Sequence, residues 1–379
     1  MKAGWQVLRL GDVCEFEKSQ GIHAGLPYVG LEDIESQTAR FIGSVEPQGV
    51  KSSTFKFSTQ HVLYGRLRPY LNKVFAPDFD GHCSSEIFPM MPSPALSREY
   101  LLYWLLSADT VERINATCTG ARMPRANMNE VLDFDIPTPP RPEQQRIVTL
   151  LDEAFAGIAT AKANAEKNLQ NARAIFESHL QSVFTQRGDG WLEMQLGEVG
   201  KVSMCKRIFK EETKPTGDIP FYKIGTFGKI ADSFIPNELY RQYRDNYPFP
   251  NRGDVLISAA GTIGRRVIYD GEHAYFQDSN IVWISNDQTL LLNHYLYHFY
   301  GACEWNSTRG ATISRLYNDN LKRIVIPFPK SLYEQQRIAV QMDEISDQTS
   351  RLNDIYQQKI VAIDELKKSL LHRAFSGDL

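Results

Sequence analysis

The chain carries one run of residues twice: Glu143-Gln144-Gln145-Arg146-Ile147, and about 190 residues later Glu334-Gln335-Gln336-Arg337-Ile338. Each run opens a long helical pattern, and an Asp-Glu pair follows at the same spacing, as Asp152-Glu153 and as Asp343-Glu344. A repeat at a long, fixed interval indicates a duplicated structural unit. The run therefore marks the start of a long helix in each of two similar halves.

The two halves also begin alike. Trp5-Gln6-Val7-Leu8-Arg9-Leu10-Gly11-Asp12-Val13 is matched by Trp191-Leu192-Glu193-Met194-Gln195-Leu196-Gly197-Glu198-Val199. We therefore predict four segments: a first globular domain at 1–140, a central spacer helix at 141–187, a second globular domain at 188–330 and a C-terminal spacer helix at 331–379. Such a chain has two similar recognition surfaces.

The composition is that of a globular protein. Of the 379 residues, 42% are hydrophobic and 11% are aromatic, which is enough for two packed cores. The first residues lack an apolar signal core, and the most apolar window, 290–300, is short and interrupted by polar residues. We expect an intracellular protein that does not enter a membrane.

Cysteine and histidine give little sign of a metal site. The five cysteines are widely scattered and none forms a C-x-x-C motif, which argues against a disulfide framework and against a zinc site. His294 and His298 lie four residues apart on a predicted helix, but no Glu lies between them as the hydrolytic zinc motif requires. We interpret them as half-buried structural histidines and expect no bound metal.

Positive charge is clustered locally, although the formal net charge is -3. The stretch 47–77 contains five basic residues and no acidic one, and in the second half 201–210 contains four basic residues without a carboxylate. Such clusters can bind phosphate groups, although a run of charges more often faces water.

Short apolar runs separated by Gly, Pro, Asn and Asp predict strands in the first half. They lie at 28–31, 62–64, 74–76 and 85–90, and a helix is predicted directly after Ser97, a good N-cap residue. Strands followed by helices are typical of an α+β domain.

The second half repeats this order. Val255-Leu256-Ile257-Ser258 matches Val62-Leu63-Tyr64-Gly65, and Arg266-Val267 matches Lys73-Val74, both at an offset of 193 (255 minus 62; 266 minus 73). Further on, Arg315 parallels Arg125. Most other positions differ, as expected if two copies of one fold bind two different ligands.

Both long segments show the spacing of amphipathic helices of the coiled-coil type. The C-terminal apolar seam contains Ile338, Met342, Ile345, Thr349, Leu352, Tyr356, Ile363, Leu366 and Leu370, and the central seam runs from Ile147 and Leu151 to Leu180 and Val183. Since neither seam can stay exposed to water, we predict that the helices pack antiparallel, with the two domains at opposite ends and related by a pseudo-twofold axis. Pairing of each helix with a partner protein stays open.

These motifs, in this order, closely resemble the specificity subunit of type I restriction-modification systems over the whole chain. The resemblance is strongest in the two helices, in the two domain starts, and in the stretches 67–74 and 261–267; the closing run is Arg373-Ala374-Phe375-Ser376-Gly377-Asp378-Leu379. One departure is Gly120-Ala121-Arg122, where the second half has the usual family form Gly310-Ala311-Thr312.

The resemblance implies that each globular part is a target recognition domain that reads one half of a bipartite, asymmetric sequence in double-stranded DNA. The helices would separate the halves and dock two copies of a DNA adenine methyltransferase subunit, which binds S-adenosylmethionine and methylates adenine N6. Where a restriction and translocase subunit is present, it uses ATP and cuts unmethylated DNA. A defence system of this kind acts in the prokaryotic cytoplasm, on the nucleoid.

The sequence also supports a non-catalytic role for this chain. It contains neither a glycine-rich cofactor loop after a strand nor an Asn/Asp-Pro-Pro-aromatic methyltransferase motif, and its Glu365-Leu366-Lys367 lies on an amphipathic helix. We expect no catalytic residue and no cofactor here.

Arg or Lys recognises guanine edges in the major groove, and Asn or Gln recognises adenine, while other basic groups bind phosphate. The candidate DNA-binding residues are Arg66, Arg68, Tyr70, Lys73, Arg122 and Arg125 in the first domain, and Lys206, Arg207, Arg265, Arg266, Arg309 and Arg315 in the second. The competing interpretation is that Tyr70 shapes a turn and that the matched position of Lys73 and Arg266 serves the scaffold. For docking of subunits, the candidates are Arg146, Phe155, Phe176, Arg337, Tyr356 and Phe375.

Two other functions stay open at this point. The chain would serve equally as the specificity subunit of a bifunctional nuclease-methyltransferase of the type IIB kind. Alternatively, an adaptor with two protein-binding or glycan-binding modules would share the duplicated layout. Such an adaptor would show no salt-sensitive affinity for DNA.

Overall fold

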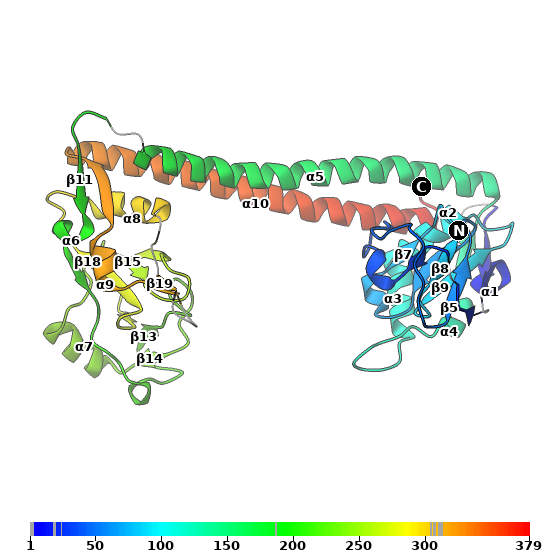
Figure 1. Cartoon of the computed structure of the whole chain (residues 1–379), viewed down its shortest axis with the longest axis horizontal. Helices are drawn as coiled ribbons and strands as arrows, with labels where there is room; N and C mark the ends of the chain where they lie inside the picture. Colours follow the sequence, from blue (N-terminus) through cyan, green and yellow to red (C-terminus); the bar gives the residue numbers. More distant parts are fainter. Residues whose placement is uncertain are drawn as a thin grey trace. The chain divides into compact units, whose positions relative to one another are not determined.

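The computed structural model describes residues 4–17, 20–23, 25–185, 188–303, 305 and 315–379, together with the backbone of 308–309 and 314. The chain divides into two compact units (Figure 1). The first unit comprises Met1–Lys167 and Tyr356–Leu379, and the second comprises Asn168–Ile355. Each unit thus contains one globular domain and parts of both long helices.

The globular part of the first unit is a set of small sheets covered by helices. Its elements are β1 (Gln6–Arg9), α1 (Leu10–Val13), β2 (Cys14–Phe16), β3 (Gln20–Gly21), β4 (Tyr28–Val29), η1 (Leu31–Asp33), β5 (Thr54–Phe57), β6 (Val62–Gly65), η2 (Pro69–Leu71), β7 (Val74–Phe75), β8 (Gly81–Cys83), β9 (Ile87–Pro92), α2 (Arg98–Leu106), α3 (Ala108–Ala116), α4 (Met128–Leu132) and β10 (Asp135–Thr138). The sheets have the strand orders β1-β10, β2-β9-β6-β7 and β3-β5-β8-β4.

The globular part of the second unit follows the same plan. Its elements are β11 (Trp191–Gln195), α6 (Leu196–Val199), β12 (Lys201–Ser203), η3 (Lys210–Glu212), β13 (Ile219–Tyr222), β14 (Phe234–Ile235), α7 (Asn237–Asn246), β15 (Val255–Ser258), β16 (Arg266–Ile268), β17 (Tyr275–Phe276), β18 (Ile281–Ser285), α8 (Asn293–Ala302), β19 (Thr308–Arg309), β20 (Ser314–Arg315), α9 (Asn318–Lys322) and β21 (Val325–Pro329). The sheets are β11-β21, β12-β18-β15-β16, β14-β13-β17 and β19-β20.

The two globular parts share their main topology. In each, the first strand pairs antiparallel with the last, β1 with β10 and β11 with β21. In each, a four-stranded sheet has the same order, since β2-β9-β6-β7 corresponds to β12-β18-β15-β16. The prediction of two similar α+β domains is therefore confirmed. They differ in the remaining strands, and α7 belongs to the second domain alone among the described elements.

The helix predicted after Ser97 is present as α2. The Ser97 side chain accepts a hydrogen bond from the backbone N–H of Tyr100 at 3.1 Å and so satisfies one of the free donors of the first turn. The Tyr100 ring is fully buried, and its hydroxyl donates to the Pro137 carbonyl at 2.9 Å. In the second domain, Tyr295 of α8 makes the same bond to Pro327.

The long helices α5 (Arg141–Thr185) and α10 (Leu332–Ser376) pack antiparallel within each unit. In the first unit, the Nζ atom of Lys162 lies 2.7 Å from a carboxylate oxygen of Asp364. In the second unit, Arg173 donates to the side-chain oxygen of Asn353 at 2.9 Å. Near the start of α5, Arg146 also donates to the carbonyl of Leu379, just beyond the end of α10, at 2.8 Å. In the second unit, Leu180 and Phe184 from the end of α5 share a core with Ile338 and Met342 from the start of α10. The predicted antiparallel pairing is therefore confirmed within each unit.

The predicted seam of α10 is only partly buried. Ile338 and Met342 belong to the core of the second unit, but Leu352 is 42% exposed and Leu366 is 51% exposed. Near the other end of the helix, Leu371 and Ala374 belong to the core of the first unit. The prediction was wrong at Leu352 and Leu366, because burial of α10 is concentrated at its two ends, where it packs on the globular parts.

Each repeated Glu-Gln-Gln-Arg-Ile run contains one fully buried glutamine that fastens the helix to its domain. The Gln144 amide accepts a hydrogen bond from the backbone N–H of Ser97 at 2.8 Å and donates to the carbonyls of Ala95 and Pro139, both at 2.8 Å. A side-chain amide has both donor and acceptor atoms, so it can satisfy all three of these backbone groups.

Gln335 makes the equivalent bonds in the second unit. Its amide accepts from the backbone N–H of Leu292 at 2.8 Å and donates to the carbonyls of Leu290 and Pro329 at 2.9 and 2.8 Å. The long helix, the strand that leads into it and the segment before α2 or α8 are thus tied together at one point in each unit.

We expect the substitution Gln144→Leu to lower the free energy of unfolding of the first unit by roughly 2–4 kcal/mol, because three backbone groups would lose their partner inside the protein. Urea denaturation and hydrogen exchange of the first domain measure this effect. The neighbouring Gln145 is exposed, and Gln145→Leu is the matched control. Equal stability of the two variants would rule out the anchoring role.

Candidate nucleic-acid interface

Two segments of the first domain that are distant in sequence come together beside the end of β6. Leu67 forms a β-bridge with Arg125, and Arg125 forms a second bridge with Thr119. The backbone N–H of Ala126 donates to the Arg66 carbonyl at 2.9 Å, and that of Arg68 donates to the Pro124 carbonyl at 2.7 Å. The segment between α3 and α4 therefore runs beside residues 66–68, and Figure 1 shows it as a loop that projects from the domain.

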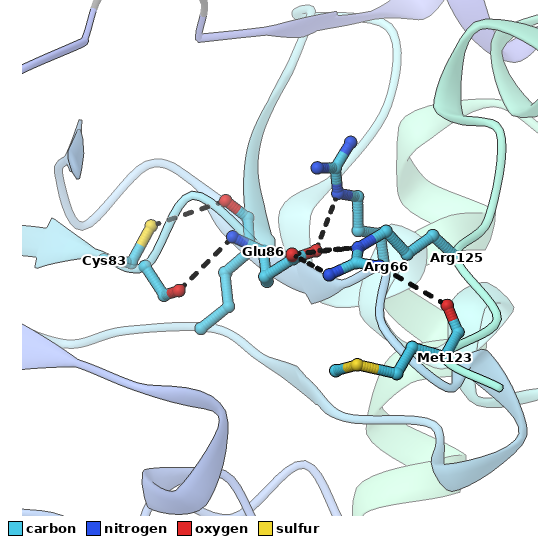
Figure 2. Close-up of polar contacts among 7 residues, drawn as sticks. Arg66, Cys83, Glu86, Met123 and Arg125 are labelled. Carbon is cyan, nitrogen blue, oxygen red and sulfur yellow. Dashed lines mark hydrogen bonds and ion pairs between the residues drawn. The ribbon is translucent and has the colours of Figure 1, made fainter. Parts of the chain in front are cut away.

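One carboxylate holds two of the candidate arginines. Oε2 of Glu86 accepts a hydrogen bond from Nε of Arg66 at 2.9 Å, and Oε1 accepts from Nε and Nη2 of Arg125 at 2.9 and 2.8 Å (Figure 2). The backbone N–H of Arg66 also donates to the Glu86 carbonyl at 2.9 Å, which continues the pairing of β6 with β9. We call Glu86, Arg66 and Arg125 the arginine fork.

Both arginines of the fork keep guanidinium nitrogens that can donate to a further acceptor. The guanidinium of Arg66 lies 5.4 Å from the centre of the Phe88 ring, and neither of its terminal nitrogens donates a hydrogen bond among the described residues. In Arg125, Nη1 makes only a long 3.4 Å bond to the Met123 carbonyl. Hydrogen bonding from Arg125, aided by Arg66, lowers the pKa of the Glu86 carboxyl, so the fork is ionised at neutral pH.

The remaining first-domain candidates divide into exposed and structural groups. Arg68 and Arg122 are exposed, and Tyr70 is half-exposed in η2. Arg68 adopts a left-handed backbone conformation with φ of 51°, which turns the chain sharply at the end of the β6 segment. Lys73, by contrast, donates to the Leu31 carbonyl at 2.6 Å and so braces two parts of the domain.

Arg207 and Lys206 of the second domain are exposed and lightly tethered. Arg207 pairs with Asp278 at 2.9 Å, and Lys206 lies 4.9 Å from the centre of the Tyr247 ring. Arg265 donates to the Phe227 carbonyl at 3.0 Å. The side chain of Arg309 lies outside the described residues.

The side chain of Arg266 packs on an aromatic ring of its own domain. Its guanidinium lies 4.6 Å from the centre of the Tyr297 ring on α8, and its Nε is buried. The absence of a side chain at Gly301 makes room for it, because a Cβ atom there would lie 2.5 Å from Nη2 of Arg266. Of the candidates matched between the halves, Lys73 and Arg266 thus both make side-chain contacts within their own domain.

The arginine fork has no carboxylate counterpart at the matching place in the second domain. Arg315 forms a β-bridge with Ala260, as Arg125 does with Leu67, so the backbone arrangement is repeated. In the strand pairing, Ser258 faces Ile281 as Gly65 faces Ile87, so Asn280 takes the place of Glu86. Arg315 makes only a 3.5 Å hydrogen bond to the carbonyl of the neighbouring Ser279. Sequence analysis did not identify Glu86, since a single acid ahead of a strand has no distinctive pattern.

The candidates for docking on the long helices are mostly engaged within their own unit. Phe155 packs on Tyr103 with ring centres 5.4 Å apart, and Phe375 packs on Tyr100 at 5.1 Å. Phe176 is partly buried against the core of the second unit, and Tyr356 is partly exposed. Arg146 and Arg337 are paired with Glu143 and Glu334, at 2.7 and 2.5 Å.

Comparison with known proteins identifies the class. A family model described as the type I restriction modification DNA specificity domain matches twice, at residues 2–170 and 188–362. A putative type I restriction enzyme specificity subunit from Haemophilus influenzae is 42% identical over 277 residues, which cover 72% of this chain and 70% of the relative. The EcoDI specificity subunit of Escherichia coli is 28% identical over 196 residues, covering 50% of this chain and 43% of the relative.

Solved structures share the fold. A chain from a study of assembly and conformational transition of the type I restriction-modification system superposes with a TM-score of 0.84 at 21% identity and covers 100% of this chain and 99% of its own. The HsdS subunit from Thermoanaerobacter tengcongensis gives a TM-score of 0.65 at 20% identity, with coverage of 100% and 98%. Two copies of one DNA specificity domain define the class, and the chain belongs to the type I restriction-modification DNA specificity family.

A search of the described helices for a membrane span found none of sufficient length and apolar character to cross a bilayer.

We expect Glu86→Gln to destabilise the first domain by about 1 kcal/mol at neutral pH, since a partly exposed carboxylate that bonds two arginines is lost. The pKa of Glu86 is lowered in the folded state, so its contribution is present above the ordinary glutamate pKa and disappears as the pH falls through the folded value. The stabilities of the wild type and the variant should therefore converge once the pH falls below the folded-state pKa of Glu86, which is lower than that of a free glutamate. Urea denaturation at several pH values tests this, with exposed Glu46→Gln as the control; a difference that does not change with pH would contradict the fork.

Proposed function

We propose that this specificity subunit reads a bipartite, asymmetric DNA site, one half with each recognition domain, and delivers that specificity to separate catalytic subunits. The observation that carries the proposal is the shared β-topology of the two domains combined with different side chains at equivalent places, of which Glu86 and Asn280 are an example. One scaffold with two different reading surfaces suits an asymmetric site.

Within the first domain, we assign different roles to the two groups of arginines. Arg68 and Arg122 are exposed, and no hydrogen bond of either side chain to the described residues holds it in place, so they suit contacts to phosphate. Arg66 and Arg125 are oriented by Glu86, and an arginine with a fixed guanidinium plane suits the two acceptors of guanine in the major groove. In the second domain, the candidates are Arg315, whose β-bridge to Ala260 matches that of Arg125 to Leu67, together with Lys206, Arg207, Arg265 and Arg309.

The long helices are proposed to dock two copies of an adenine-N6 methyltransferase subunit, one for each half of the duplicated chain. Exposed apolar side chains along α5 and α10 support this role; they include Leu150, Ile175, Val340, Leu352, Ile355, Val361 and Leu366. A relative of the same fold comes from a study of complex assembly in such a system. In this scheme S-adenosylmethionine and, where a restriction subunit joins, ATP bind to the partners, and this chain contributes no catalytic group.

Exchange of residues 1–140 for the corresponding domain of a relative should change one half of the recognised sequence and leave the other intact. Sequencing of adenine methylation in a host that carries this chain with its methyltransferase partner measures the outcome. The wild type should give a split, asymmetric motif modified on opposite strands. If both halves change on exchange, the domains are not independent readers.

Arg68→Ala should weaken DNA binding by roughly tenfold for all sequences and reduce the slope of log affinity against log salt by about 0.9, the value for one lost phosphate contact. Binding is measured on the assembled complex over a range of salt concentrations. Arg9→Ala removes another exposed charge, on the β1 strand and 4.0 Å from Asp133, and is the control. A loss confined to one base pair would instead assign Arg68 to reading a base.

A further inference from the structure

The second unit contains a cluster of two histidines and one aspartate at the junction of α8 and α10. Nε2 of His294 lies 2.6 Å from one carboxylate oxygen of Asp343, and Nε2 of His298 lies 2.9 Å from the other. The three ligand-type atoms all lie within 4.8 Å of one another. We call these residues the His-His-Asp cluster, and it is the only such group of three found among the described residues.

The first unit shows what the scaffold alone requires at this place. There Asp152, the counterpart of Asp343, accepts a hydrogen bond from the hydroxyl of Tyr103. Alignment of Tyr100 with Tyr295 pairs Tyr103 with His298, and pairs Glu99 with His294. In the first unit, one neutral hydroxyl donor therefore suffices to hold the carboxylate of Asp152. In the second unit, two imidazoles surround the equivalent carboxylate of Asp343.

We propose that the His-His-Asp cluster binds a divalent transition-metal ion of the zinc type, which links α8 of the second recognition domain to α10. Two imidazole nitrogens and one carboxylate oxygen are ligands that zinc prefers, and water would complete a four-coordinate site. Two histidines four residues apart on a helix project on the same side and can share one ion.

The cluster needs only a small adjustment to accept the ion. Tetrahedral zinc ligands lie roughly 3.3 Å apart, given metal–ligand distances of about 2.0 Å. The present separations of 2.6 and 2.9 Å between Nε2 and oxygen must therefore widen slightly. Asp343 can supply the movement because its side chain is 48% exposed, and this exposure also gives the ion a route from solvent.

The surroundings of His298 fix which of its nitrogens can bind a metal. The side chain is only 3% exposed. Nδ1 of His298 is buried without a hydrogen-bond partner among the described residues, so Nε2 is the nitrogen that the protein presents to a ligand.

A neighbouring amide can support the second histidine. The side-chain amide of Gln336 lies 3.3 Å from Nδ1 of His294. When Nε2 binds a metal, the proton of a neutral imidazole resides on Nδ1, and rotation of the amide by half a turn presents an oxygen to accept it. Histidines that bind metals commonly have such an acceptor behind them.

The test is calorimetric titration of the full-length chain, stripped with a chelator, with zinc chloride. We expect one ion per chain, and we expect Asp343→Asn and His294→Gln each to weaken binding at least tenfold. Both positions are partly exposed, so these variants should fold, which circular dichroism checks. Cobalt provides a second measurement, because its visible ligand-field absorption should change on binding to the wild type and not to either variant.

The exposed pair His372 and Asp109, whose side chains are 2.7 Å apart, provides the matched control. His372→Gln should bind zinc as the wild type does, and magnesium should not bind at the cluster, since it prefers oxygen ligands. Absence of zinc binding by the wild type would overturn the proposal, as would unchanged binding by Asp343→Asn and His294→Gln. The outcome does not depend on whether the chain reads DNA.

Discussion

Two buried glutamine amides, those of Gln144 and Gln335, hold each long helix to its own globular domain. Each amide satisfies three backbone groups that would otherwise be buried without partners, and no apolar side chain can do this. The amide joins three segments: the end of the last strand, the first turn of the long helix, and the loop before α2 or α8. The orientation of a recognition domain on its helix is therefore set by directional bonds as well as by apolar packing.

Around this joint, the two units keep the same interactions and elsewhere they diverge. Tyr100 and Tyr295 donate to equivalent proline carbonyls, and Phe375 and Phe184 pack on those tyrosines at 5.1 and 5.3 Å. Side chains at equivalent places differ elsewhere, as at Glu86 and Asn280. A fold that fixes its backbone by internal bonds can change such side chains without loss of the scaffold, as the proposed function requires of two separate reading surfaces.

The arginine fork also bears on how a chain of net charge -3 recognises DNA. The negative charge of Glu86 offsets part of the positive charge of Arg66 and Arg125. Its hydrogen bonds also fix the planes of their guanidinium groups. Under the proposed function, fixed arginines contribute more to selectivity than to affinity, and freely exposed ones such as Arg68 and Arg122 contribute mainly to affinity. The recognition surface therefore does not require a strongly basic domain.

The sequence by itself determined the duplication, the α+β class, the two long helices and the cap at Ser97. These features depend on apolar periodicity and on bonds between residues a few positions apart, which a sequence displays directly. It also supplied most of the basic residues at the candidate interface. Only the tertiary structure decided their contacts: Arg125 bonds to Glu86, 39 residues away, Lys73 bonds to the Leu31 carbonyl, and Arg266 packs on Tyr297. It likewise left Leu352 and Leu366 exposed and brought Asp343 to His294 and His298. These outcomes depend on which distant segments the sheets and helices bring together, and no local pattern in the chain encodes that.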